Sequence, residues 1–312
     1  MSTNLEIKQI GFPEGMPEAT SYGSGFSRGT LVSFENPGAG LAKLLFLSGT
    51  ASIDAKGQVV AVGDLAAQKT RKWYNINGVF RSAGMELRQI VHAATYIKPE
   101  HAPNGTQSAS TLDNSHDLYL SDVCRDGWLT ETDALAVDNQ SGLDLSPFCQ
   151  AYADYHRMAM RGSTKQTERI ISVGDLDFLL LYDFAEADKP VNELTSTEYK
   201  AIMTDLFKRL TTTLTRDGRA NWRDVVDTRF NLGQFLAHPH DIKSNGPNDN
   251  YYTLCFNPVR TEVYQAEGVG AVRPVENDHY PNPSSTGIFA NITQIPDNFV
   301  AGVEVVAVYQ AR

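Results

Sequence analysis

Two short patterns contain residue types that often carry chemistry in proteins. His238, His240 and Asp241 stand close together, and imidazole and carboxylate groups are ligands that suit zinc or iron. No matching motif supplies a third ligand, and Pro, Asn and Gly surround the pattern, so it favours a surface loop and no metal. Cys149 and His156 are seven residues apart on an expected helix, which places them two turns apart on one face. Without an orienting motif, they do not indicate a nucleophilic pair.

Motifs for nucleotide cofactors are missing from the sequence. Gly268-Val-Gly270 lacks the third glycine and the strand–helix turn of a dinucleotide fingerprint. The chain also has no Walker A sequence and no Gly-x-Ser-x-Gly elbow. The sequence therefore gives no indication of a nucleotide cofactor.

The net charge of the chain is negative, and the acidic residues are unevenly distributed along the sequence. The 312 residues contain 27 Lys and Arg against 37 Asp and Glu, a net charge of −10. This balance disfavours nucleic acids and anionic membranes as partners, because such binding depends on basic residues that neutralise phosphates. Residues 113–154 hold nine acidic residues against Arg125 alone, a net charge of −8. Their Ser, Asn and Gly punctuation predicts loops, so we interpret the segment as a solvated insertion, with a lid or an anion-rejecting site as alternatives.

The sequence favours a cytoplasmic protein. No basic region followed by an apolar run opens the chain, and the longest apolar stretches, such as 44–47 and 178–182, have the length of strands. The three cysteines are widely spaced, which fits a reducing compartment.

An internal repeat organises the chain. The apolar runs 43–49 and 178–184 predict buried strands 135 residues apart, and a second pair of expected strands, 88–97 and 223–232, has the same offset. Further candidate strands, Phe26–Glu35 and Arg169–Val173, precede the apolar runs and predict hairpins.

A long amphipathic helix is expected within each repeat. Asp64 is a plausible N-cap of the first helix, which should end at Gly84. The second begins with the capping-box pattern Thr195-x-x-Glu198 and should end before Gly218.

These elements predict an α+β protein of two duplicated domains, in which each mixed β-sheet is packed by helices. We place the boundary at residues 155–160. The first domain would cover residues 1–155, with the acidic insertion at about 99–150, and the second would cover residues 156–312.

At this point the chain resembles a known family, RidA, also called YjgF. The resemblance lies in Leu45–Asp54, in Gly63-Asp-x-x-x-Gln68, and in the ending Ile292–Pro296 followed by Val303–Val308. It covers residues 22–97 well and 285–309 moderately. It implies two RidA-like (chorismate-mutase-like) domains, with ligand clefts between domains.

The resemblance also implies which residues form a site. Glu304 would position or activate the attacking water, and Tyr22 would donate a hydrogen bond, so both are candidate catalytic residues. Ser48 aligns with the family serine and would bind substrate together with Gly49 and Thr50.

One family residue is missing. Where the family has the motif PARS, whose arginine grips a substrate carboxylate, this chain reads Pro283-Ser-Ser-Thr-Gly287. Arg161, in a segment similar to the lost motif, and Arg273 are the candidate replacements.

The leading functional hypothesis is an enzyme that acts without a cofactor on a small unsaturated or imine/enamine-type metabolite. The reaction would be hydrolytic deamination or a lyase or cyclase step in a specialised biosynthetic pathway. One alternative is a hydrolase or lyase similar to the chorismatases, which are tandem RidA-like enzymes. Another is a non-catalytic metabolite-binding protein. The family usually forms trimers, so the chain would assemble as a homo-oligomer, a trimer of tandem chains, or remain a pseudo-oligomeric monomer.

Overall fold

The protein is described from a computed structural model. This structure describes residues 4–19, 25–36, 39–101, 115–119, 127–160, 162–233, 237–246, 249–269, 282–289 and 295–311. Tyr22, Arg161 and Arg273 lie outside these ranges.

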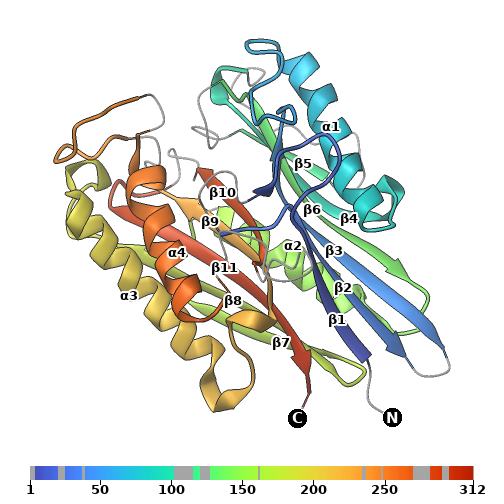
Figure 1. The fold of residues 1–312 in the computed structure, drawn as a ribbon. Coiled ribbons are helices and arrows are strands. Elements are labelled where there is room, and N and C mark those ends of the chain that lie inside the picture. The colour runs from blue at the N-terminus through green and yellow to red at the C-terminus, as the bar shows by residue number, and fades with distance from the viewer. Residues whose placement is uncertain are drawn as a thin grey trace.

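The first half of the chain forms a six-stranded sheet in the order β1-β2-β3-β6-β4-β5 (Figure 1). Its strands are β1 (Asn4–Ile10), β2 (Gly29–Asn36), β3 (Gly40–Ala51), β4 (Ile90–Ile97), β5 (Ser115–Tyr119) and β6 (Thr130–Asn139). Helix α1 (Leu65–Ser82) connects β3 to β4 and packs on one face of the sheet. Neighbouring strands are antiparallel, except that β4 and β5 are parallel.

The second half forms a five-stranded sheet in the order β7-β8-β11-β9-β10. Its strands are β7 (Thr167–Val173), β8 (Leu176–Glu186), β9 (Val225–Leu232), β10 (Ser284–Phe289) and β11 (Phe299–Gln310). Helix α3 (Ser196–Leu214) covers one face, and a π-helical turn (Tyr252–Phe256) leads into α4 (Asn257–Ala266) beside it. Short 3₁₀ turns occupy Leu87–Gln89, Pro99–His101, Val191–Glu193, Arg216–Gly218 and Trp222–Asp224.

The two sheets share one topology. The order β2-β3-β6-β4-β5 of the first sheet recurs as β7-β8-β11-β9-β10, and the last pair is parallel in both sheets. Both ends of β9 lie 135 residues after the corresponding ends of β4, as the sequence offset predicts. The α+β class, with two sheets each packed by helices, is therefore confirmed, and so are the two hairpins, β2–β3 and β7–β8.

The expected helix signals act as predicted. The Asp64 carboxylate accepts a hydrogen bond from the backbone N–H of Ala67, and Thr195 and Glu198 form a reciprocal capping box. Gly84 follows α1 with a φ of +63°, a conformation that favours glycine.

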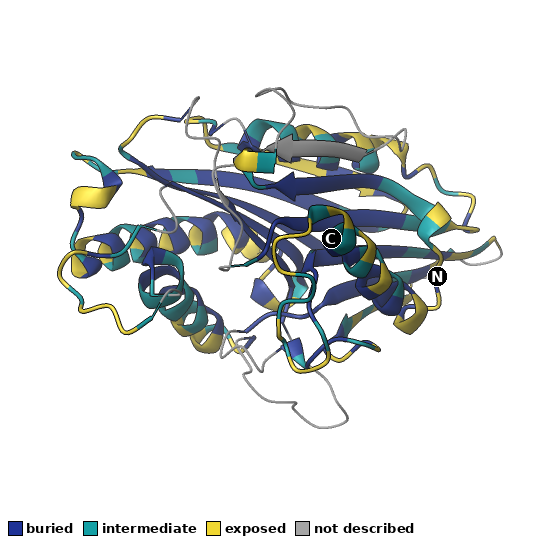
Figure 2. Cartoon of the chain, turned by 90° about the horizontal axis from the view of Figure 1, so that it is seen from above, coloured by how far each residue is buried: buried dark blue, intermediate teal, exposed yellow. Residues whose placement is uncertain are grey.

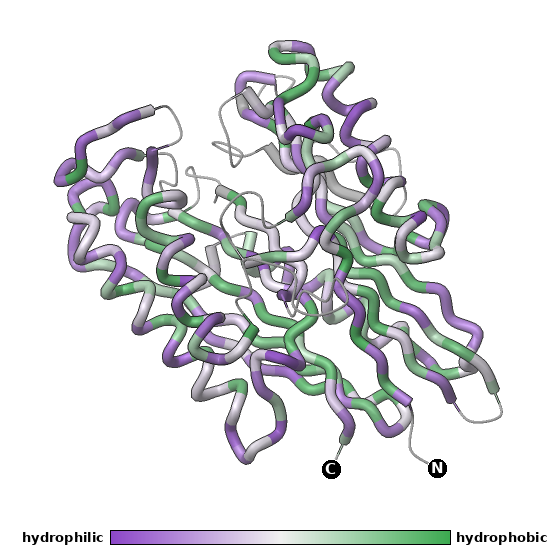
Figure 3. Tube along the Cα trace, in the orientation of Figure 1, coloured by the Kyte–Doolittle hydropathy of each residue, from purple (hydrophilic) through white to green (hydrophobic). Residues whose placement is uncertain are grey.

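Helix α2 (Ser146–Met160) lies between the two sheets, on the faces that α1, α3 and α4 leave free (Figure 1). Phe148 of α2 is fully buried and packs against Phe178 of β8 and Phe46 of β3, with ring centroids 4.4 and 6.2 Å away. The central strands of the sheets, β3, β6, β4, β8, β11 and β9, are buried along most of their length (Figure 2), and hydrophobic residues follow them in Figure 3. The strands β1 and β7 are mostly exposed or half-buried. The inner faces of the two sheets thus share one core around α2. The domain boundary expected near residue 155 stays a prediction, and it falls within this helix.

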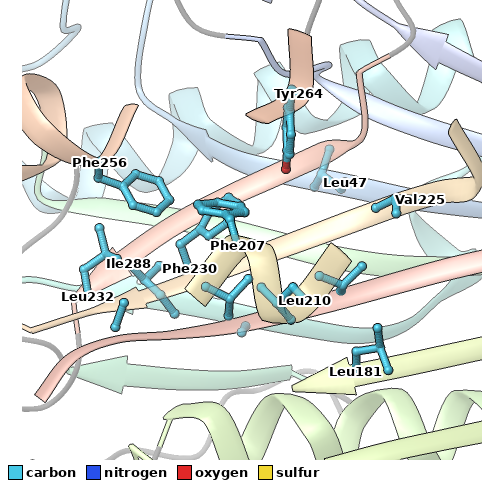
Figure 4. Packing of buried hydrophobic residues seen from close by; sticks show 14 of the residues in the cluster. Leu47, Leu181, Phe207, Leu210, Val225, Phe230, Leu232, Phe256, Tyr264 and Ile288 are labelled. Carbon is cyan, nitrogen blue, oxygen red and sulfur yellow. The ribbon is translucent and has the colours of Figure 1, made fainter. Parts of the chain in front are cut away.

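A second core lies beneath α3 and α4 (Figure 4). Phe207 of α3 and Phe256 pack there against Phe230 of β9, and Tyr264 of α4 packs against Phe207. This aromatic layer holds α4 against the second sheet.

The interpretation of residues 113–154 as solvated loops is wrong for part of that segment. Residues 130–139 form β6, which lies between β3 and β4 in the first sheet, and its Glu131 and Asp133 are buried. The reason is that Asp133 has a charged partner in the second sheet, described below, which offsets the cost of burying its carboxylate. Among the described residues, no helix is long and apolar enough to cross a membrane.

The shared core predicts a large, cooperative effect of one substitution. We expect Phe148→Ala to lower the free energy of unfolding by about 3–5 kcal/mol, because it opens a cavity between both sheets and α2. Phe12→Ala is the matched control, since Phe12 is 72% exposed and should change stability by less than about 0.5 kcal/mol. Denaturant unfolding followed by circular dichroism measures both. Equal effects of the two variants would contradict a core shared by both sheets.

Candidate functional site

Ser48 lies where the first sheet meets the edge strand of the second. Its hydroxyl accepts a hydrogen bond from the backbone N–H of Ser285 in β10 (2.8 Å) and donates one to the carbonyl of Ser27. The backbone N–H of Gly49 donates to Oγ1 of Thr286 (2.8 Å). Thr50 Oγ1 donates to the carbonyl of Ser48 (2.9 Å). The serine motif therefore joins the two halves of the chain.

At Gly49, a larger residue would have to displace the side chain of Glu131. A Cβ atom there would stand 2.0 Å from Oε1 of Glu131 and 3.1 Å from Cγ2 of Thr286. The substrate-binding role expected for Ser48, Gly49 and Thr50 stays a prediction. Within the described residues, their polar atoms bond to protein.

Glu304 lies in β11, opposite Arg229 of β9 and Tyr182 of β8. Its side chain is buried, and Oε2 accepts a hydrogen bond from Nη1 of Arg229 at 3.2 Å. Oε1 is 3.9 Å from Nδ1 of His156, which α2 supplies. Burial raises the pKa of Glu304 to about 7, although the guanidinium of Arg229 opposes the shift. Near neutral pH, this carboxyl group can both hold and release a proton.

Asp133 occupies the position in the first sheet that corresponds to Glu304 in the second. Asp133 pairs with Ala94 of β4, and Glu304 pairs with Arg229, which lies 135 residues after Ala94. Nε of Arg229 donates to Oδ2 of Asp133 at 3.1 Å. One fully buried guanidinium therefore bridges two carboxylates from corresponding strands.

Aromatic and imidazole groups complete the surroundings of Arg229. Tyr96 donates to Oδ2 of Asp133 at 2.7 Å and lies 3.3 Å from Nε2 of His156. Tyr152 of α2 places its ring 4.3 Å from the guanidinium carbon of Arg229 and accepts a hydrogen bond from Nη2. We call the following set the inter-sheet polar cluster: Tyr96, Asp133, Tyr152, His156, Asp227, Arg229 and Glu304.

Asp227 is the third carboxyl group of the cluster. It accepts hydrogen bonds from Tyr152 (2.9 Å) and from Ser284 Oγ (2.6 Å), and its Oδ2 is 3.6 Å from Nη2 of Arg229. Burial raises its pKa, against the attraction of Arg229.

The electrostatics of the cluster favour retained protons. Burial alone would lower the pKa of Arg229, but the surrounding carboxylates hold it well above its ordinary value, so Arg229 stays charged. Burial also raises the pKa of Tyr96 and Tyr152 far above the ordinary tyrosine value, so both remain neutral donors. Three acidic groups around one cation cannot all ionise cheaply in a buried site. The arrangement can therefore store a proton and pass it along hydrogen bonds.

The catalytic role expected for Glu304 stays a prediction, and sequence reasoning did not anticipate its partners. The available signal was the expected strand 223–232, in which Asp227, Arg229 and Asn231 stand at every second position and therefore share one face. All three are buried, because this face of β9 turns toward α2 and the first sheet. Asp241 of the possible metal pattern instead accepts hydrogen bonds from the backbone N–H and the hydroxyl of Ser196 (2.8 and 2.7 Å) at the start of α3.

Comparison with known proteins gives similarities of fold only. No protein-family profile matches the chain, and no curated protein matches it either. Several solved structures are similar to part of the chain. The Escherichia coli YjgF gene product is 19% identical over 42% of this chain and 99% of its own, with a TM-score of 0.30. A putative endoribonuclease from Thermotoga maritima (16% identity, 42% and 98% coverage, TM-score 0.32) and E. coli TdcF with bound serine (16%, 42% and 100%, 0.29) are similar to the same degree.

The bridge through Arg229 predicts a specific loss of stability. Arg229→Met should lower the free energy of unfolding by about 3–5 kcal/mol, because it leaves Asp133 and Glu304 buried without their cation. Arg81→Met is the control, since Arg81 pairs with Glu14 at the surface and should change stability by less than about 1 kcal/mol. Adding Glu304→Gln to Arg229→Met should recover part of the loss. No recovery in urea unfolding would argue against the Glu304–Arg229 contact.

The raised pKa of Glu304 predicts how stability depends on pH. The folded state holds this proton up to a pH of about 7, whereas the unfolded state releases it near 4.5, so stability should fall as the pH rises through this window. Glu304 alone contributes up to about 3 kcal/mol to this fall. Glu304→Gln should flatten the curve between pH 5 and 7, measured by urea unfolding at closely spaced pH values. Parallel curves for the variant and the unmodified protein would contradict the assignment.

Proposed function

We propose that the protein is an enzyme that acts without a cofactor on a small unsaturated or imine/enamine-type metabolite, with Glu304 as its general acid and base. The observation that supports this most directly is the contact of Glu304 with Arg229 inside the inter-sheet polar cluster. A catalytic acid and base works best when its pKa lies near the working pH, and Glu304 meets this condition.

The groups around Glu304 suit hydrolysis of a C=N bond. As the carboxylate, Glu304 takes a proton from water while the oxygen bonds to the imine carbon. The protonated Glu304 then gives this proton to nitrogen, which yields a carbinolamine. Glu304 next takes the hydroxyl proton of the carbinolamine and passes it to nitrogen while the C–N bond breaks, so that a carbonyl compound and ammonia leave. Arg229 stabilises the carboxylate form of Glu304 that begins and ends the reaction, and the hydrogen-bonded Tyr96 and His156 offer a path for proton exchange.

The other predicted site residues belong to this proposal. Tyr22 would donate a hydrogen bond, and Ser48, Gly49 and Thr50 would contact the substrate. Arg161 or Arg273 would bind an anionic group of it. We further propose a cytoplasmic protein that works as a homo-oligomer of tandem chains or as a pseudo-oligomeric monomer.

Two alternatives have distinct products. A chorismatase-like hydrolase or lyase would release pyruvate from chorismate. A metabolite-binding protein would return its ligand unchanged, and this alternative is favoured by Ser48, whose hydroxyl is already bonded to Ser27 and Ser285.

One set of assays separates these functions. Imines generated in place from several amino acids by an amino-acid oxidase should lose ammonia faster when the protein is added, and chorismate should yield no pyruvate. Pyruvate from chorismate would favour the chorismatase-like alternative. Binding without turnover of any substrate, measured by calorimetry and by product analysis, would favour the binding protein.

Catalysis by Glu304 predicts a loss of rate and a changed pH profile. With a substrate identified in these assays, Glu304→Gln should lower kcat by about 10²–10⁴-fold, because water loses its base. For the unmodified enzyme, kcat should rise with pH up to about 7 and then level off. Glu6→Gln, on the exposed side of β1, is the matched control and should leave both unchanged. A purely structural role of the cluster predicts the opposite: Glu304→Gln would alter stability while the folded variant keeps full activity.

A further inference from the structure

Arg260 is a buried cation, and one edge of its guanidinium group makes no hydrogen bond to the described residues. It lies on α4 and is 1% exposed, and its Nη1 donates a hydrogen bond to Oγ of Ser285 in β10 at 3.1 Å. Its Nε and Nη2 atoms are buried and have no hydrogen-bond partner among the residues that the structure describes. In the same described ranges, no carboxylate forms an ion pair with Arg260, in contrast to Arg229 with its three.

Aromatic rings hold the guanidinium in place. Its central carbon lies 5.5 Å from the ring centroid of Phe230 and 5.6 Å from that of Phe256. Figure 4 shows these two side chains together in the core beneath α3 and α4. Together with the hydrogen bond to Ser285, they fix the position of Arg260 before anything binds to it.

The two unpartnered nitrogens form one edge of the guanidinium plane. Nε and Nη2 carry parallel N–H groups, and this fork matches the two oxygens of a carboxylate. A buried charge without a partner is costly, and so is each buried donor without an acceptor. A bound carboxylate would remove both costs at once.

We propose that Arg260 binds the carboxylate of a small organic acid through Nε and Nη2. A carboxylate fits better than a phosphate or sulfate dianion, because Arg260 supplies one positive charge beside the rings of Phe230 and Phe256 and would leave a second negative charge uncompensated. Ser285 completes the site by holding Nη1.

This site is separate from the inter-sheet polar cluster and goes beyond the proposed function. Successive residues of a strand point to opposite faces of the sheet. Ser284 bonds to Asp227 of the cluster, whereas Ser285 bonds to Arg260. In the same way, Arg229 faces the cluster, whereas Phe230 faces Arg260. Loss of carboxylate binding would therefore not by itself disprove catalysis by Glu304, and the reverse is also true.

The test uses carboxylates of increasing size, formate, acetate and butyrate, with the matching amides as neutral controls at equal ionic strength. Saturation-transfer NMR reports binding directly, and thermal unfolding reports it through stabilisation. We expect at least one carboxylate to show transfer and to raise Tm by about 2–4 °C over sodium chloride, while its amide does neither. Absence of transfer and of stabilisation for all three carboxylates would overturn the proposal.

Three variants separate binding from folding. Arg260→Met should abolish the response to carboxylates, and its Tm in chloride should equal or exceed that of the unmodified protein, because an uncompensated buried charge has been removed. Arg260→Lys keeps the charge without the fork and should weaken binding at least tenfold. If neither folds, Ser285→Ala should still weaken carboxylate binding several-fold. An unchanged response in any folded Arg260 variant would place the carboxylate elsewhere.

Discussion

The structure depends on one buried ion network, in which Arg229 of the second sheet bridges Asp133 of the first sheet and Glu304 of its own. Burying a guanidinium is costly unless carboxylates offset its charge, and one of the carboxylates around Arg229 comes from the other half of the chain. Because the network crosses between the sheets, it fixes how they face each other. The aromatic contacts of α2 around Phe148 then supply the apolar part of the same interface. Neither half of the chain has this network alone.

Topology explains why the network forms where it does. The two sheets repeat the same strand order, so Asp133 and Glu304 reach corresponding positions on inner faces that meet around α2. The two sheets differ in the residue that pairs with Glu304 and with Asp133 on the neighbouring strand. The second sheet places Arg229 there, whereas the first sheet has Ala94 at the matching position. A single arginine can therefore serve both carboxylates without a second cation next to it, which leaves the cluster with an excess of acidic groups and with protons to exchange.

Patterns of neighbouring residues predicted the helices and strands well. They did not predict which side chains from distant parts of the chain would contact each other. The capping box at Thr195 and the N-cap at Asp64 are sequence-local, and the 135-residue offset is a property of spacing alone, so the amino-acid sequence is enough to predict each of them. The burial of Asp133 is different. Its surroundings in sequence are acidic and rich in loop-forming residues, and the group that stabilises its buried carboxylate is 96 residues away in Arg229. A motif pointed to Glu304, but its protonation depends on Arg229 and Asp227 in β9 and on Asp133 in β6, which the motif does not contain.

The contrast between two buried arginines separates structural charge from binding capacity. Arg229 directs its donors to Asp133, Glu304 and Tyr152, so its charge stabilises the fold and tunes the acidity of Glu304. Arg260 is equally buried, yet only its Nη1 is used, and the edge that best fits a carboxylate is left without a partner in the described part of the chain. Folding alone would favour an apolar side chain among Phe230 and Phe256. The presence of a charged fork there is therefore best explained by a ligand that supplies the missing negative charge.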